Sequence, residues 1–203
     1  MPVRSHNEFL ADFKTHLHIF VDELDAAYAE YREKTRELAP KLESRTKAGI
    51  IRDLAARRMR EVCEKTKGAQ FIRRGNLGVV GWVNNWILRP KKLADGFKVA
   101  VSPTSASRAY NRNEVPASLS GALLSEPPAT CLYLGWIIPE NAPERIAKYV
   151  VCNNQFGEIA WVHPLDEDSP PPAQRLPIER PPQPGDDTRR VRVRVGAGRK
   201  ANG

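Results

Sequence analysis

The chain has 203 residues, of which 41% are hydrophobic and 28% charged, a composition that suits one globular domain with an appendage. Lys and Arg number 32 against 24 for Asp and Glu, so the formal charge is +8 and the expected partner is a polyanion or an acidic protein. Cys63, Cys131 and Cys152 are odd in number and lack C-x-x-C spacing, which argues against a disulfide framework and a structural zinc site.

Residues 7–38 are predicted to form one long amphipathic helix, because apolar residues recur there at three- and four-residue steps. These residues are Phe9, Phe13, Leu17, Phe20, Leu24, Tyr28 and Tyr31. Pro40 ends the helix, and at about 45 Å it either packs on the chain's own sheet, which we favour, or meets a partner chain. Charges interrupt the apolar positions of residues 1–20, so we expect neither a secretory signal nor a membrane span. The expected location is therefore the cytoplasm.

Residues 46–67 predict a second, basic helix, with Ser44 or Thr46 as its N-terminal cap and Gly68 at its C-terminal end. Its apolar side consists of Ile51, Ala55, Met59 and Val62. Its other side carries Lys47, Arg52, Arg57, Arg58, Arg60, Lys65 and Lys67. Such a face either lies along phosphates or is simply solvated.

Strands are predicted within residues 70–163, where the apolar period changes to two. They cover Leu77–Val83, Trp86–Arg89, Cys131–Ile138, Ile146–Cys152 and Glu158–His163, with a further extended piece over Gly96–Val101. Asn84 and Asn85 tolerate positive φ and predict a hairpin turn, whereas residues 102–121 have the composition of a long polar loop. Short turns imply an antiparallel sheet, so residues 1–166 are predicted to form a single α+β domain with two leading helices.

Residues 167–203 cannot build a core and are predicted to form a disordered tail, first Pro-rich and then Arg-rich. Arg190, Arg192 and Arg194 alternate with valines, so in a strand they would share one face. The tail is therefore either a candidate electrostatic or strand-adding contact, or a free solvated segment.

A hairpin of a metal-dependent nuclease would need an Asp entering its second strand and a D/E-x-K on the next strand. This chain has Asn84, Asn85 and the segment ILRPKK instead, which cannot hold a divalent cation. No glycine-rich phosphate loop is present, so neither a metal nor a cofactor is predicted. His163, beside Trp161, is a weak candidate for a general acid or base in a metal-free ribonuclease, the alternative being a structural imidazole.

The hairpin around Asn84-Asn85 combines tryptophans with a dense set of cations and no acidic residue. Its candidate contacts to nucleic acid or a partner are Arg73, Arg74, Trp82, Trp86, Arg89, Lys91 and Lys92. Aromatic rings among cations on a sheet suit single-stranded nucleic acid. Tryptophans in strands are also common core residues, and we interpret the hairpin as a core element with basic flanks.

Four segments, RTKAGIIRDLAARRM, FIRRGNLGVVGWVNNWILRPKKL, PPATCLYLGWI and GEIAWVHPL, resemble a family of small bacterial toxin-like proteins that occur beside antitoxin-type regulators. The segments fall within Arg45–Leu165. The resemblance implies a toxin and an acidic antitoxin-like partner. Where members of that family carry acidic residues after the first strand of the hairpin, this chain has Asn84 and Asn85, so no hydrolytic activity is transferred to it.

The expected function is that of a non-enzymatic, toxin-like protein that inhibits growth by binding nucleic acid or a replication protein. One such target is the sliding clamp, as in SocB-like toxins. QFIRRG, QFGEIAW and QRLPIE approximate clamp-binding peptides, in which a Gln precedes an apolar pair. The alternatives are a non-toxic nucleic-acid-binding accessory or regulatory protein, and a metal-free ribonuclease that uses His163.

Overall fold

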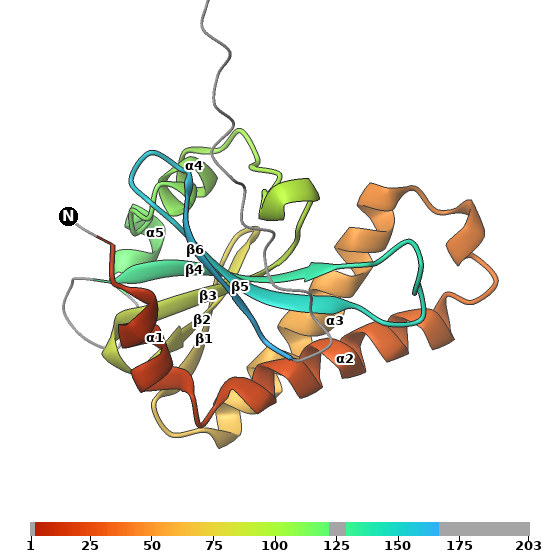
Figure 1. The fold of residues 1–203 in the computed structure, drawn as a ribbon, viewed down its shortest axis with the longest axis horizontal. Helices are drawn as coiled ribbons and strands as arrows, with labels where there is room; N and C mark the ends of the chain where they lie inside the picture. Colours follow the sequence, from red (N-terminus) through yellow and green to blue (C-terminus); the bar gives the residue numbers. More distant parts are fainter. Residues whose placement is uncertain (1–2, 122–128, 167–203) are drawn as a thin grey trace, which may run out of the picture. The chain divides into compact units, whose positions relative to one another are not determined.

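The computed structural model describes residues 3–121 and 129–166. The helices are α1 (His6–Phe13), α2 (Leu17–Lys34), α3 (Ser44–Lys65), α4 (Ser105–Asn111) and α5 (Ala117–Ser120). The strands are β1 (Ala69–Arg74), β2 (Leu77–Trp82), β3 (Trp86–Lys92), β4 (Thr130–Ile137), β5 (Ala147–Asn153) and β6 (Ile159–Pro164). They form one sheet in the order β1-β2-β3-β4-β5-β6, in which β3 and β4 are parallel and the other neighbours antiparallel (Figure 1).

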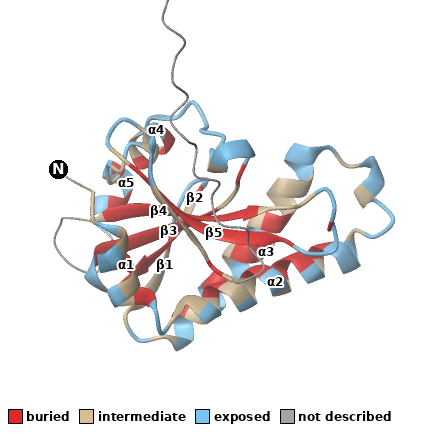
Figure 2. Ribbon diagram, in the orientation of Figure 1, coloured by how far each residue is buried: buried red, intermediate tan, exposed pale blue. Residues whose placement is uncertain are grey.

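The sheet is covered on both faces. Helices α1, α2 and α3 pack with Trp82, Trp86 and Leu88 on one face, and α4 and α5 pack with Ile87 and Tyr133 on the other. The central strands are accordingly buried along most of their length (Figure 2). The predicted α+β class, with leading helices on a mostly antiparallel sheet, is confirmed.

The single helix predicted over residues 7–38 is two helices, α1 and α2, with a turn over residues 14–16. The predicted apolar stripe is nevertheless the buried side of both. The turn lets the Phe9 ring pack on Trp86 and Trp161, while Phe20 packs on Trp82. No proline or glycine occurs at the break, so the cause is tertiary packing, which the periodicity of the sequence does not report.

The second predicted helix is α3, which begins earlier than expected. Its N-cap is Glu43, and no side chain there caps the helix, so the prediction that Ser44 or Thr46 does so is wrong. The prediction that Gly68 follows the end of the helix agrees with the structure. Gly68 has φ 84°, a left-handed conformation that suits glycine after a helix.

The predicted hairpin turn is present between β2 and β3. Trp82 pairs with Trp86, and Asn84 and Asn85 have φ of 60° and 58°. Asparagine tolerates this left-handed conformation because its short polar side chain can hydrogen-bond locally.

The polar segment 102–121, predicted as a loop, contains α4 and α5. Thr104 Oγ1 accepts a hydrogen bond from the Ser107 N–H at 3.2 Å and so caps α4. Tyr110 of α4 is fully buried, and its hydroxyl lies 2.8 Å from the Ile87 carbonyl and 2.7 Å from the Leu132 carbonyl. This helical crossover is what allows β3 and β4 to run parallel, which the expectation of short turns had excluded.

Two further expectations differ from the structure or lie beyond it. Residues 96–101 form no strand; a 3₁₀ turn over Asp95–Phe97 and a single bridge between Leu93 and Val99 occur instead. The predicted disordered tail, with Arg190, Arg192 and Arg194, lies outside the described residues. Within the described ranges, no helix has the length and apolar character needed to cross a membrane.

Candidate anion-binding cleft

Strand β3 separates from β2 halfway along its length. It pairs with β4 from Trp86 to Lys92, but with β2 only from Trp86 to Leu88. The β1–β2 hairpin stays paired as far as Arg74↔Leu77, so it diverges from β3 as a unit. Pro90, which has no N–H to donate, lies in this unpaired stretch, where a strand tolerates proline.

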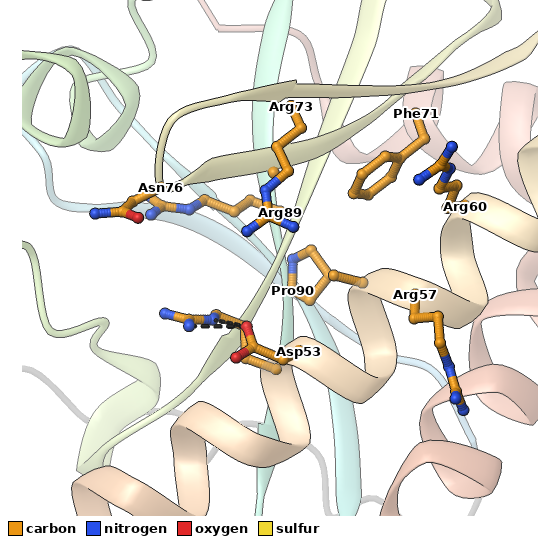
Figure 3. Close-up of a pocket in the computed structure, with 11 residues that line it drawn as sticks. Asp53, Arg57, Arg60, Phe71, Arg73, Asn76, Arg89 and Pro90 are labelled. Atoms are coloured by element: carbon orange, nitrogen blue, oxygen red, sulfur yellow. Dashed lines mark hydrogen bonds and ion pairs between the residues drawn. The ribbon is translucent and has the colours of Figure 1, made fainter.

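The divergence opens a pocket of about 550 Å³ between the β1–β2 hairpin, β3 and α3 (Figure 3). We call it the arginine cleft. Its lining residues are Arg52, Asp53, Ala56, Arg57, Arg60, Phe71, Arg73, Asn76, Gly78, Arg89 and Pro90. Five of them are arginines and one is an acid, so the cleft is strongly positive.

The three arginines from α3 each have a carboxylate partner. The pairs are Arg52–Asp53 at 2.8 Å, Arg57–Glu30 at 2.5 Å and Arg60–Glu64 at 3.4 Å. Arg73 and Arg89, from the two diverging strands, form no ion pair within residues 3–121 and 129–166. The excess positive charge of the cleft therefore belongs to the sheet side.

Arg89 is the most unusual of these residues because it is only 7% exposed. Its guanidinium lies 5.8 Å from the centroid of the Tyr110 ring, a cation–π contact. Taking an ion out of water is costly unless it is paired and hydrogen-bonded, and an aromatic ring recovers only part of that cost. Arg89 is thus a largely buried residue whose charged end lines the cleft and has no carboxylate partner in the described ranges.

Lys91 follows two residues later on β3. Burial, together with the charges of Arg89 and Arg52, lowers its pKa to about 8. Burial is the larger cause of the shift, and the smaller part is repulsion from the two arginines. A bound anion would relieve this repulsion and raise the pKa of Lys91.

Phe71 supplies an aromatic surface inside the cleft. Its ring lies over Gly78 of the neighbouring strand, where an added Cβ would lie 3.4 Å from Phe71 Cζ. The ring is partly buried, and Figure 3 shows the Arg60 side chain beside it. An aromatic face next to guanidiniums can take a planar ligand group as well as an anion.

The other predicted contact residues have different surroundings. Arg74 is exposed and is not among the lining residues, and the Lys92 ammonium donates to Ser44 Oγ at 2.8 Å. Trp82 and Trp86 are 2% and 0% exposed, so their assignment as binding residues is corrected: they are core residues with no face free for a base.

The turn of the β2–β3 hairpin is fixed by Asp12 of α1. Its carboxylate accepts hydrogen bonds from Trp86 Nε1 at 2.6 Å, Arg4 at 2.9 Å and Asn84 Nδ2 at 3.0 Å. Burial raises the pKa of Asp12, but these bonds outweigh burial and hold it below its ordinary value. The acid that the hairpin lacks in sequence is thus supplied from α1. This carboxylate holds the turn in place. In the described ranges, no cluster of three side chains that could hold a metal ion occurs.

His163 of β6 has a partner that the sequence did not indicate. Its Nδ1 lies 3.0 Å from His6 Nε2, and its ring contacts Phe9. Burial lowers the pKa of His163, and the neighbouring His6 adds to the effect. The pair joins α1 to β6, and neither histidine is among the lining residues of the arginine cleft.

Two of the eleven lining residues, Arg73 and Arg89, are among the binding residues predicted from the sequence, and the α3 arginines were predicted only as part of a cationic helical face. Pro90 within a strand was the signal that could have located the cleft, because proline marks a stretch without a ladder partner.

Comparisons with known protein families, curated proteins and solved structures found no match.

Proposed function

We propose that this protein binds nucleic acid by holding phosphate in the arginine cleft. The observation that carries the proposal is Arg89, a residue only 7% exposed that lines the cleft and has no carboxylate partner in the described ranges. Guanidinium groups bind phosphate oxygens in bidentate fashion, and such charge-assisted bonds are among the strongest in proteins.

Two further features favour nucleic acid over an acidic protein as the ligand. Phe71 presents a partly exposed ring between Arg73 and Arg60, and nucleobases stack on aromatic rings beside arginines. The formal charge of +8 would draw any polyanion to the surface, whereas the ring adds affinity only for a ligand with a planar group.

In the cell, we propose that this binding inhibits growth, as the resemblance to toxin-like proteins implies. An acidic antitoxin-like partner would then neutralise the protein by occupying the same cations. If growth is unaffected, the same cleft would serve a nucleic-acid-binding accessory or regulatory protein.

A second candidate, binding to a replication protein such as the sliding clamp, is favoured by the turn between β5 and β6. Gln155 and Phe156 lie there, and Phe156 is 72% exposed. Gln70, by contrast, lies in β1 and pairs with Gly81 of β2, and the QRLPIE segment lies outside the described residues. Substituting Phe156 with Ser would abolish clamp binding and leave nucleic-acid binding unchanged; retained clamp binding would reject this candidate.

The test is the affinity for labelled single-stranded DNA, single-stranded RNA and duplex DNA, measured by fluorescence anisotropy. Replacing Arg73 and Arg89 with Gln is expected to weaken binding about 100-fold, or about 2.8 kcal/mol at 1.4 kcal/mol per tenfold. The matched control replaces Arg36 and Arg74, both exposed and outside the cleft, and changes the net charge equally.

The salt dependence gives a second measure. Loss of two phosphate contacts should reduce the slope of log K against log salt by about 1.4 on a single strand. Equal weakening in the two double variants would mean that only the net charge matters, and the cleft would not be the site.

A further inference from the structure

We propose that the arginine cleft recognises the terminal phosphate of a nucleotide, a phosphomonoester, rather than the phosphodiesters within a strand. This inference rests on the proposed function and specifies its ligand. It follows from the depth of the cleft, from its charge and from its size.

The depth of the cleft favours a chain end. Arg89 lies where β2 and β3 begin to diverge, next to Leu88, the last residue of β3 paired with β2. The lining comes from the β1–β2 hairpin, from β3 and from α3. A phosphodiester carries a sugar on both sides. For an internal phosphate to reach Arg89, the nucleic-acid strand would therefore have to enter the cleft and leave it again. A terminal phosphate can reach the guanidinium of Arg89, a residue only 7% exposed that lines the cleft, with only one sugar behind it.

The charge favours a dianion. A phosphomonoester carries about −1.5 to −2 at pH 7, whereas each phosphodiester carries about −1. Arg73 and Arg89 both line the cleft and both lack a carboxylate partner in the described ranges, so two uncompensated positive charges face the ligand. The three arginines that α3 contributes to the cleft are already paired with acids.

The size favours a single nucleotide. The cleft holds about 550 Å³, within the range of about 300–1,000 Å³ typical of a site for one small ligand. Its lining includes one aromatic ring, Phe71, so one base has a stacking partner while the phosphate occupies the guanidiniums. The side chain of Asn76, at the β1–β2 turn, is the neutral hydrogen-bonding group in the lining and can bond to the sugar or base.

The experiment compares one single-stranded oligonucleotide sequence in three forms: with a 5′-phosphate, with a 3′-phosphate, and with hydroxyls at both ends. One phosphorylated form is expected to bind the full-length protein at least tenfold more tightly than the hydroxyl form. Replacing Arg89 with Gln should remove that preference, and the exposed-site control, Arg74→Gln, should retain it. Arg73→Gln provides a second variant at an exposed position of the cleft, in case Arg89→Gln does not fold.

Two further arms identify the source of the phosphate. A nucleoside monophosphate that competes with the phosphorylated oligonucleotide, when inorganic phosphate at the same concentration does not, supports recognition of a terminal nucleotide. Equal competition by inorganic phosphate would overturn the role of Phe71 and the base. The preference should also shrink between pH 7 and pH 5, as the phosphomonoester loses its second charge with a pKa of about 6.

The outcomes separate this inference from the proposed function. If the three oligonucleotides bind equally and all lose affinity in the Arg73/Arg89 double variant, terminal recognition is wrong and nucleic-acid binding stands. If no oligonucleotide binds but a nucleoside monophosphate does, nucleic-acid binding is wrong and the phosphomonoester site stands. If nothing binds, both are wrong.

Discussion

Replacing Arg89 with methionine is expected to make the unliganded protein more stable. Methionine keeps the unbranched apolar stem of a residue that is only 7% exposed, and it removes a guanidinium that has no carboxylate partner in the described ranges. The effective cost of burying an ion is several kcal/mol, and a cation–π contact such as the one to Tyr110, at 5.8 Å, recovers up to about 2 kcal/mol. With a cost of about 3 kcal/mol, the difference is a net gain of about 1 kcal/mol.

For a folded unit of this size, 1 kcal/mol corresponds to a rise in Tm of about 2–4 °C. The assay is thermal and urea unfolding followed by circular dichroism at pH 7 in a buffer free of phosphate. The control, Arg74→Met, changes the same charge at an exposed position and should alter stability by less than about 0.5 kcal/mol.

A loss of 1 kcal/mol or more in the Arg89 variant would refute the reasoning. It would mean that the folded protein already satisfies the guanidinium, and the main argument for a missing anion would fall. The same variant must also lose affinity for nucleic acid, since a stabilised protein with unchanged binding would separate Arg89 from the function.

Three other predictions concern the framework around the cleft. Asp12→Ala removes the acceptor of three hydrogen bonds at the hairpin turn and should cost about 2–3 kcal/mol in urea unfolding; a loss under 0.5 kcal/mol would show that α1 does not fix the turn. Gly135→Ala would place a Cβ 2.6 Å from Leu93 Cγ, so it should destabilise by about 1–3 kcal/mol, and an unchanged Tm would contradict the close approach. The folded-state pKa of His163 lies below 6.5, so its contribution to stability is fully present above pH 6.5 and is lost as pH falls through the folded-state value. His163→Gln should reduce the loss of stability at acid pH. An unchanged loss would mean that it is not caused by His163 and its contact with His6.

The sequence predicted the elements whose signals are local. The Asn84-Asn85 turn was predictable because few other residues accept positive φ, and the apolar stripe of the first two helices was predictable from its spacing. The buried sides of α1 and α2 follow that stripe closely.

The features that the sequence did not predict depend on contacts between distant residues. The break between α1 and α2 follows from where Trp82 and Trp86 lie in the folded core, more than 65 positions along the chain. Helix α4 was hidden in a polar segment because it is short and buries its tyrosine through bonds to two strand carbonyls. Short helices gain their stability from such contacts and carry little periodic signal of their own.

Only part of the arginine cleft could be predicted from the sequence. Arg73 and Arg89 stood out as cations near a hairpin, but they were grouped with Trp82 and Trp86, which the fold buries. What distinguishes Arg89 from Arg74 is burial without a counter-charge, and this property depends on contacts with residues distant in the sequence, such as Tyr110. Composition counts the two arginines equally.

The measurement that tests the central claim most directly is NMR of the arginine side chains during titration with a phosphorylated single-stranded oligonucleotide. We expect the Nε–H signals of Arg73 and Arg89 to shift together and saturate, while those of Arg36 and Arg74 stay in place. Shifts of equal size at all four arginines, or shifts that leave out Arg89, would contradict the claim that the arginine cleft is where this protein binds phosphate.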